Sequence, residues 1–215
     1  MNNNSENLTG ITLKNVGKKF RDQWVFKGLD FHVNAGEKVA INGHNGSGKS
    51  TLLQIIGGYV SASDGKVIWE TEKGTINDDV IYRHIALASP YMDLIDEFTL
   101  NENIEFFIRL KPIRKGITIS DIIKATGLKD AADRQFRYFS SGMKQKVKLT
   151  LAFMAAAELL LLDEPLSNLD QSGYEWYREM ASNYSEGKTV LVCSNMVKEE
   201  TFFCNRIVNI EDYRS

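Results

Sequence analysis

The chain has 215 residues, of which 43% are hydrophobic, so it can bury the core of one domain, or of one domain with a small appended lobe. A formal net charge of −2 and a pI near 6.0 give no overall basic field, which argues against nucleic acid as the main partner. The two cysteines, Cys193 and Cys204, lack metal-ligand spacing and favour a reducing compartment without a disulfide framework.

The first ten residues, MNNNSENLTG, lack the basic and apolar regions of a signal peptide and predict a frayed end. The longest apolar run extends from Leu149 to Leu162 and is interrupted by Glu158. Because this run is shorter than the roughly 18 to 20 residues of a membrane-spanning helix, we expect a chain that does not itself cross a bilayer.

Short segments of alternating or continuous apolar character predict strands along the chain, at residues 11–16, 29–33, 38–42, 66–70, 84–89, 158–163, 189–193 and 206–210. Between them, Thr99 and Glu102 form a capping-box pattern before a helix, and Gly127 has the position of a helix C-cap. We therefore predict a mixed α/β core at 1–89 and 158–215, with a mostly helical lobe inserted at 90–157.

The strongest chemical motif follows the strand at 38–42. The sequence GHNGSGKST fits G-x-x-x-x-G-K-[ST] at every fixed position and precedes the helical sequence STLLQIIGG. Such glycines let backbone N–H groups surround phosphates at the positive end of a helix. The alternative is a glycine-rich turn with a chance lysine. The predicted nucleotide-binding residues are Gly43, His44, Asn45, Gly46, Ser47, Gly48, Lys49, Ser50 and Thr51.

Three of these residues have expected roles that follow from phosphate chemistry. Lys49 is expected to reach the β- and γ-phosphates, and Ser50 to bind Mg²⁺ through its hydroxyl. Thr51 is expected to donate a hydrogen bond to the α-phosphate. The motif thus predicts ATP and Mg²⁺ as the ligand and the metal.

A second motif, ELLLLDEP at 158–165, is an apolar strand that ends in two acids. Asp163 is the acid expected to support Mg²⁺, as in a Walker B segment. Glu164 follows it and is expected to take a proton from the water that attacks the γ-phosphate. The alternative is an Asp-Glu-Pro sequence that merely ends a strand.

These motifs, together with the sequences FSSGMKQKVKLTLAF and SNLD, resemble the ATP-binding-cassette (ABC) ATPases over nearly the whole chain. The segment 139–143 corresponds to the family signature LSGGQ and is identical to it only at Ser140 and Gly142. SNLD, at 167–170, resembles the family's D-loop. Phe20 lies where the family stacks an aromatic ring on adenine.

The resemblance implies one ABC ATPase domain over residues 1–215, with a P-loop NTPase core, an N-terminal antiparallel β region and an inserted helical subdomain. It also implies a homodimer or heterodimer that sandwiches two ATP molecules between its subunits. In that dimer Ser140, Ser141 and Gly142 would bind the nucleotide held by the second subunit, because a helix N-terminus favours negative charge.

The chain departs from the family pattern at two positions. Asn195 lies where the family has a histidine, and Pro90 where it has a glutamine; a one-residue shift would instead place Ser89 or Tyr91 at the glutamine position. Ser194 and Asn195 are interpreted as a ligand-facing pair, with Asn195 donating to a γ-phosphate oxygen; a turn with a helix cap is the alternative. Surface, loop or packing roles are expected for the three histidines, which are His32, His44 and His84.

The implied function is ATP hydrolysis, with Lys49, Glu164 and Asn195 as catalytic residues, in a peripheral subunit on the cytoplasmic side of the cell membrane. Separate permease chains would span the membrane and dock near SPYMDLIDEF, at 89–98. The alternative is an ABC-type nucleotide switch with slow or absent hydrolysis, although Glu164 argues against complete loss. The transported substrate and the direction of transport are not encoded in these motifs.

Overall fold

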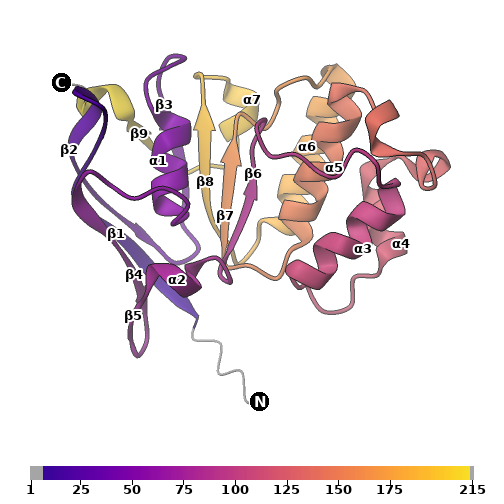
Figure 1. The fold of residues 1–215 in the computed structure, drawn as a ribbon, viewed down its shortest axis with the longest axis horizontal. Helices are drawn as coiled ribbons and strands as arrows, with labels where there is room; N and C mark the ends of the chain where they lie inside the picture. The colour runs from indigo at the N-terminus through magenta and orange to yellow at the C-terminus, as the bar shows by residue number, and fades with distance from the viewer. Residues whose placement is uncertain (1–6, 214–215) are drawn as a thin grey trace.

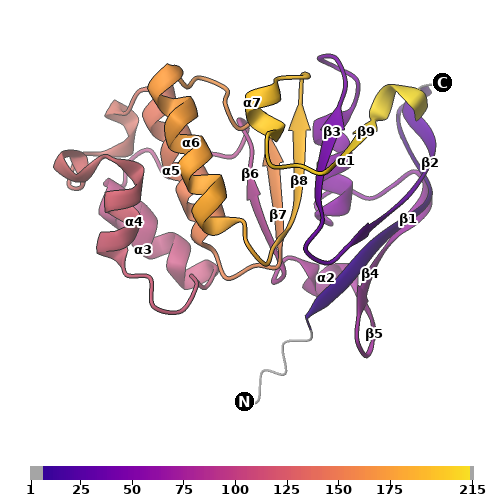
Figure 2. The same cartoon turned by 180° about the vertical axis from the view of Figure 1, so that it is seen from behind.

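The computed structural model describes residues 7–213, and it contains two β-sheets with helices between and beside them (Figures 1 and 2). A frayed end was expected over residues 1–10; residues 1–6 lie outside the described residues, whereas residues 8–10 begin the first strand, so the expectation is wrong there. The first sheet is antiparallel and has the order β2-β1-β4-β5. Its strands are β1 (Leu8–Phe20), β2 (Gln23–Asn34), β4 (Asp64–Thr71) and β5 (Gly74–Ile76). The antiparallel N-terminal β region is therefore confirmed.

The second sheet is parallel and has the order β6-β7-β8-β3-β9. Its strands are β6 (Ile85–Ala88), β7 (Leu159–Asp163), β8 (Thr189–Ser194), β3 (Lys38–Asn42) and β9 (Arg206–Asn209). Every residue of β7 and β8 is buried. A parallel sheet covered on both faces requires such continuous apolar strands, which explains why the sequence there does not alternate.

Alternate residues of the parallel strands contribute to two separate cores. Leu159, Leu161 and Leu191 pack with α1 (Lys49–Ile56) and the antiparallel sheet. Their neighbours Leu160, Leu162 and Val192 pack with α5 (Ser141–Met154) and α6 (Gln171–Tyr184) on the opposite face. Helix α1 therefore lies between the two sheets, and α5 and α6 cover the far side of the parallel sheet (Figure 1).

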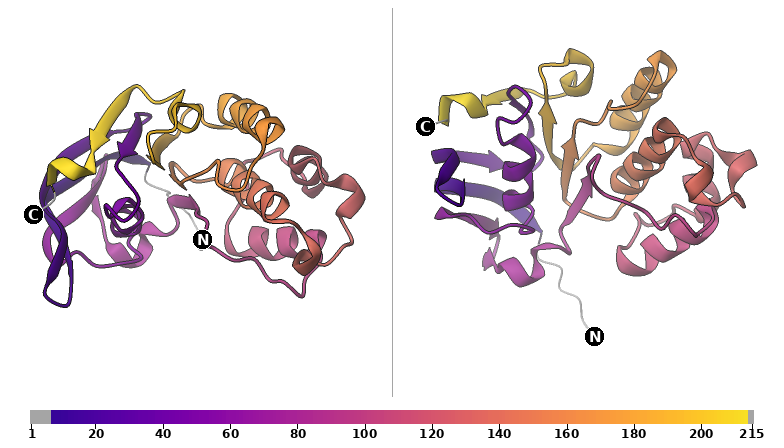
Figure 3. Two further views of the ribbon diagram at one scale, coloured as in Figure 1. Left: turned by 90° about the horizontal axis from the view of Figure 1, so that it is seen from above. Right: turned by 45° about the horizontal axis from the view of Figure 1, so that its top comes forward.

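The remaining helices are short and lie at the edges of the core. They are α2 (Asp78–Ile81), α3 (Leu100–Leu110), α4 (Ile119–Thr126) and α7 (Lys198–Thr201), with 3₁₀ turns at Lys129–Ala131, Phe136–Tyr138 and Ile210–Tyr213. Helices α3 and α4 pack beside α5, away from the antiparallel sheet (Figure 3). Within the described residues, every helix is too short or too polar to span a membrane.

The helix boundaries follow from capping chemistry. The capping box at Thr99 is present, since its hydroxyl accepts from Glu102 N and the Glu102 side chain accepts from Thr99 N. Gly127 ends α4 in the left-handed conformation, with φ of 71°. Because α3 begins only at Leu100, residues 90–98 are irregular, and the expected helical character does not extend to them.

Candidate functional site

The phosphate loop connects β3 to α1 and depends on glycine at two positions. Gly46 and Gly48 have φ of 77° and 99°, in the region that side-chain-bearing residues rarely adopt. A Cβ atom on Gly48 would also lie 2.4 Å from a methyl carbon of Val25. The loop therefore leads into α1 in the conformation that exposes the first N–H groups of the helix to an anion.

Lys49 is 4% exposed, and its ammonium is fixed by three acceptors. Nζ donates to the carbonyl oxygens of Gly43 and His44 at 2.9 and 3.0 Å. Its third hydrogen bond goes to Oδ1 of Asn195 at 2.6 Å. The positive charge is thus held at the mouth of the phosphate loop, where a phosphate oxygen would compete for its donors.

Asp163 ends β7 and holds its carboxylate against α1. Ser50 donates to Oδ1 at 3.0 Å, and Ser89 donates to Oδ2 at 3.2 Å. Burial raises the pKa of the Asp163 carboxyl above its ordinary value, and these two hydrogen bonds oppose that rise. A cation beside this carboxylate would favour its ionised form.

The donors at this position fit Mg²⁺. The Ser50 hydroxyl and the Asp163 carboxylate are hard oxygen donors, and Mg²⁺ in phosphate sites takes one or two carboxylates together with phosphate oxygens and water. Within residues 7–213, no cluster of three or more His, Cys, Asp or Glu side chains forms a complete metal cage.

Glu164 follows Asp163 and has a left-handed backbone, with φ of 45°. Such a conformation costs of order 1–3 kcal/mol in a residue other than glycine, so the surrounding structure must impose it. Asn195 Nδ2 donates to Oε1 of Glu164 at 2.9 Å, and Ser167 donates to Oε2 at 3.4 Å. The carboxylate thus points toward the phosphate loop, as a general base requires.

Ser194 and Asn195, at the end of β8, make different kinds of contact. Ser194 is fully buried, and its hydroxyl accepts from Val197 N at 3.0 Å, which closes a turn one residue before α7 begins. The Asn195 amide instead bridges Lys49 and Glu164. The turn interpretation therefore describes the contacts of Ser194, and the ligand-facing role of Asn195 stays a prediction.

A cavity of about 510 Å³ opens over the phosphate loop. Its lining residues are Val25, Asn45, Gly46, Gly48, Lys49, Ser50, Thr51, Tyr91 and Glu164. Sequence reasoning missed Val25, because this partly buried residue of β2 carries no motif and reaches the cavity only through tertiary packing. Tyr91 was expected in the permease contact and was one candidate for the glutamine position, but it was not expected to line the nucleotide cavity.

Several predicted residues lie outside that cavity lining. Phe20 is 56% exposed, with the Lys18 ammonium 5.1 Å from its ring centre. His44 is exposed, and its backbone N–H donates to Glu211 Oε1 at 3.1 Å. Ser47 is buried, and its hydroxyl has no partner among the described residues. Gly43 lies directly against that hydroxyl, since a Cβ atom there would be 2.5 Å from it.

The signature residues lie at the start of α5, and none of them lines this cavity. Ser140 and Ser141 are exposed, and the Ser140 hydroxyl accepts from Met143 N at 3.2 Å. A Cβ atom on Gly142 would lie 2.8 Å from the carbonyl oxygen of Asn168, so a larger residue would displace the D-loop. One chain therefore assembles the phosphate-loop side and leaves the signature side facing outward.

Comparison with known proteins identifies the family. A family model described as ABC transporter matches residues 26–167. The chain belongs to the ABC transporter family. The sequence-based recognition and the predicted ABC-type α/β fold are therefore confirmed.

Curated relatives resemble nearly the whole chain. A rat protein, ATP-binding cassette sub-family A member 7 of Rattus norvegicus, is 28% identical over 94% of this chain, which spans 10% of that protein's length. The Lantibiotic transport ATP-binding protein SrtF of Streptococcus pyogenes is 27% identical, covering 88% of this chain and 81% of SrtF. The printed name of SrtF describes an ATP-binding protein of lantibiotic transport.

A solved structure supports the same assignment. It is a dimeric ATP-binding cassette in a post-hydrolysis state bound to ADP and Pi, with a TM-score of 0.78 and 27% identity over 93% of each chain. That protein is a dimer with bound products of ATP hydrolysis. The likeness agrees with the expected fold of an ATP-binding cassette.

Proposed function

We propose that this chain binds ATP with Mg²⁺ and hydrolyses it to power a membrane transporter. The observation that carries the proposal is the hydrogen-bonded series from Lys49 through Asn195 to Glu164, at 2.6 and 2.9 Å. It places the phosphate-binding ammonium and the candidate base on opposite sides of one amide, beside the cavity. A glycine-rich turn without chemistry would not require a buried lysine and an adjacent carboxylate.

Each residue has a role that its contacts allow. The Lys49 ammonium would exchange carbonyl acceptors for β- and γ-phosphate oxygens. Glu164, which lines the cavity, would accept the proton of the attacking water. Ser50 and Asp163 would hold Mg²⁺, which neutralises phosphate charge when bound. Asn195 would orient the base and could turn its amide toward the γ-phosphate.

The complete site would form between two cassettes. Ser140 and Ser141 lie exposed at the N-terminus of a 14-residue helix, with Gly142 half-buried beside them, and the two serines would offer hydroxyl and N–H donors to a second subunit's nucleotide. A two-fold dimer would then form two equal sites. Homodimerisation and heterodimerisation both satisfy this geometry.

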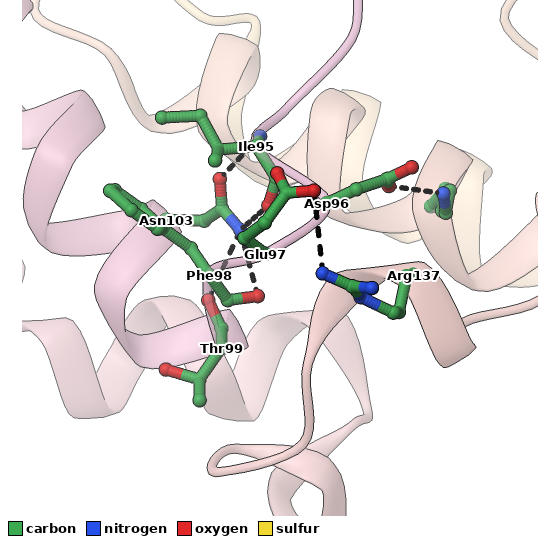
Figure 4. Close-up of polar contacts among 8 residues, drawn as sticks. Ile95, Asp96, Glu97, Phe98, Thr99, Asn103 and Arg137 are labelled. Atoms are coloured by element: carbon green, nitrogen blue, oxygen red, sulfur yellow. Dashed lines mark hydrogen bonds and ion pairs between the residues drawn. The ribbon is translucent and has the colours of Figure 1, made fainter.

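A separate permease would dock on the segment 89–98. Tyr91 is 81% exposed there, whereas Met92, Leu94, Ile95 and Phe98 are half-buried. Leu94 packs against the core of the lobe, and the Phe98 ring contacts Phe106. Asn103 fixes the end of the segment, since it accepts from Ile95 N and donates to Ile95 O, each at 2.9 Å (Figure 4). Arg137 pairs with Glu97 at 3.3 Å. These contacts hold the C-terminal half of the segment against the helical lobe.

A second surface adjoins the lobe at the end of α3. A cavity of about 810 Å³ opens there, and its lining includes Arg83, Arg109, Leu110 and Lys111. Leu110 is 67% exposed, and burial lowers the pKa of Lys111 to about 8. A permease loop with an apolar residue and an acidic residue would complement this cavity. Docking would place the chain on the cytoplasmic face of the membrane as a peripheral subunit.

The decisive experiment combines hydrolysis with capture of the partner. Purified protein should hydrolyse ATP when Mg²⁺ is added, and Lys49→Ala should weaken nucleotide binding because it removes the buried ammonium. Tyr91→Cys should cross-link to a multi-span protein in native membranes, with Lys124→Cys on α4 as the matched surface control. Nucleotide binding without measurable hydrolysis, together with capture of soluble proteins only, would replace the transporter proposal by the nucleotide switch.

A further inference from the structure

The segment after β6 reaches the metal-site acid through a serine hydroxyl. Ser89 is 6% exposed, and its hydroxyl donates to Asp163 Oδ2 at 3.2 Å. Ser50 holds the other carboxylate oxygen at 3.0 Å. Both oxygens of Asp163 are therefore oriented by hydroxyls from two different loops. Pro90, the next residue, has no side-chain donor or acceptor that could do the same.

A buried lysine fixes this serine in place. Lys148 is 7% exposed, and Nζ donates to the carbonyl oxygens of Ser89 and Pro90, each at 3.1 Å. Lysine is rarely buried without such partners, because removing its charge from water costs free energy. Its burial on α5 thus has a specific structural consequence, which is that two consecutive carbonyls of the loop are tied to this helix.

Lys148 belongs to the helix that begins at the signature residues. Lys144, one turn earlier on the same face of α5, donates to Asp96 Oδ1 at 2.6 Å. Asp96 lies in the ordered stretch that Asn103 and Arg137 hold (Figure 4). Two lysines on one helix face therefore hold the beginning and the end of the segment 89–96. A displacement of α5 would move both ends of that segment.

We propose that Lys148 and Ser89 act as a positioning pair that couples the signature helix to the metal-site carboxylate of Asp163. Lys148 sets the position of the Ser89 backbone, and the Ser89 hydroxyl sets the orientation of Asp163. The proposal rests on the proposed function, since it concerns the same Mg²⁺–ATP site. It assigns the link between helix and metal site to Ser89, one of the candidates for the family's glutamine position, and to Lys148, which no sequence motif identified.

The test measures metal dependence of nucleotide binding, without relying on turnover. Wild type, Ser89→Ala, Lys148→Met and the double variant are titrated with a fluorescent ATP analogue at increasing Mg²⁺, and again in EDTA. Residues that orient a metal ligand typically change metal affinity by 10–100-fold, so each single variant should raise the half-saturating Mg²⁺ concentration by about tenfold. Affinity for the analogue in EDTA should stay unchanged.

The double variant tests the coupling itself. If Lys148 acts through Ser89, the double variant should need no more Mg²⁺ than Ser89→Ala alone, because the link is already broken. Lys146→Met is the matched control on the same helix, since the Lys146 ammonium lies over the Trp176 ring at 5.5 Å and does not contact the loop. This control should keep the wild-type Mg²⁺ requirement.

The outcomes separate this inference from the proposed function. Wild-type Mg²⁺-dependent binding with unchanged half-saturation in Ser89→Ala and Lys148→Met would overturn the pair and leave the function standing. Additive effects in the double variant would also overturn it. Failure of the wild type to bind the analogue would instead overturn the function. If Lys148→Met does not fold, Lys148→Gln keeps donors that can reach one carbonyl and should give an intermediate shift.

Discussion

The phosphate-loop side and the signature side of this chain differ in how far one polypeptide completes them. On the phosphate-loop side, Lys49 and Asp163 are 4% and 3% exposed, and each makes at least two side-chain hydrogen bonds. On the signature side, Ser140 and Ser141 are exposed, and the Ser140 hydroxyl bonds only within its own helix among the described residues. The phosphate-loop side is therefore ordered by contacts within one chain, whereas the signature side is not.

This difference indicates where binding energy comes from. The buried side has already lost its side-chain freedom during folding, so a ligand meets groups that are preorganised. The side chains on the exposed signature side are still hydrated and free to move. They would lose water and become ordered only when a second subunit binds. Variants on the two sides should therefore fail in different assays, and the four predictions below separate them from the largest expected effect to the smallest.

Glu164→Gln should give the largest effect, because it removes the candidate base and leaves the cavity otherwise intact. General bases contribute about 10²–10⁴-fold, so turnover should fall by at least about 100-fold while ATP binding persists. Steady-state phosphate release and a nucleotide titration measure the two quantities. Glu158→Gln, at the opposite end of β7 beside His84, is the matched control and should keep wild-type turnover. Equal loss in both variants would contradict the assignment of the base.

Ser140→Arg should abolish assembly without affecting the phosphate-loop side. In the Glu164→Gln background, ATP should convert monomer to dimer, because bound nucleotide is not consumed. Arginine at 140 would crowd the position of a second subunit's γ-phosphate, so the shift in sedimentation should disappear. Ser120→Arg, at an exposed position on α4, should leave the shift intact. ATP-dependent dimers of the Ser140→Arg protein would show that the signature side does not form the interface.

The residues of the phosphate-loop side could be predicted from the sequence, because they occur at fixed positions within short motifs. Lys49 and Ser50 occupy constrained positions of one loop, and Asp163 and Glu164 end one continuous apolar strand. Parallel strands present their carboxyl ends at one edge, so these groups had to converge. The short strand β5 and the short helix α2 were missed, since three- and four-residue elements carry too little periodicity to detect.

Contacts between distant segments were not predictable from one sequence. Lys148 resembles an ordinary basic residue on a helical face, and only the packing of α5 shows that it binds the carbonyls of Ser89 and Pro90. The bridging role of Asn195 likewise requires β8, α1 and β7 to lie side by side. The division into a core and a lobe at 90–157, and the absence of a nucleic-acid partner, stay predictions.

Buried Glu200 should make the free energy of unfolding depend on pH. This side chain is 3% exposed; Oε1 accepts from Leu166 N at 3.2 Å, and Oε2 has no partner among the described residues. Burial raises the pKa of Glu200 from 4.5 to about 7. The folded state therefore binds the Glu200 proton more tightly than the unfolded state does. The resulting contribution to the free energy of unfolding is fully present below pH 4.5 and is lost as the pH rises through about 7.

The expected size of that loss is roughly 3 kcal/mol, from the difference in pKa between the unfolded and folded states. Urea unfolding of the wild type from pH 4.5 to pH 8 should show it, against the background of other titrating groups. Glu200→Gln keeps an oxygen acceptor for Leu166 N and should flatten the profile in this window. Glu199→Gln, at the exposed neighbouring position, should retain the wild-type slope. Identical slopes in all three proteins would mean that Glu200 does not hold a proton in the folded state.

Asn195→Ala should give the smallest of the four effects, because it removes an orienting amide and leaves the base and the ammonium in place. Loss of a buried polar partner costs about 1–2 kcal/mol, so turnover should fall about tenfold or slightly more, with little change in ATP affinity. Asn195→His should be tolerated, since a ring N–H can donate to Glu164 or to phosphate. Met196→Ala, at the exposed next residue, is the control. If Asn195→Ala hydrolyses ATP at the wild-type rate, Glu164 keeps its orientation through its backbone and Ser167 alone, and the preorganisation of this side would not depend on the amide bridge.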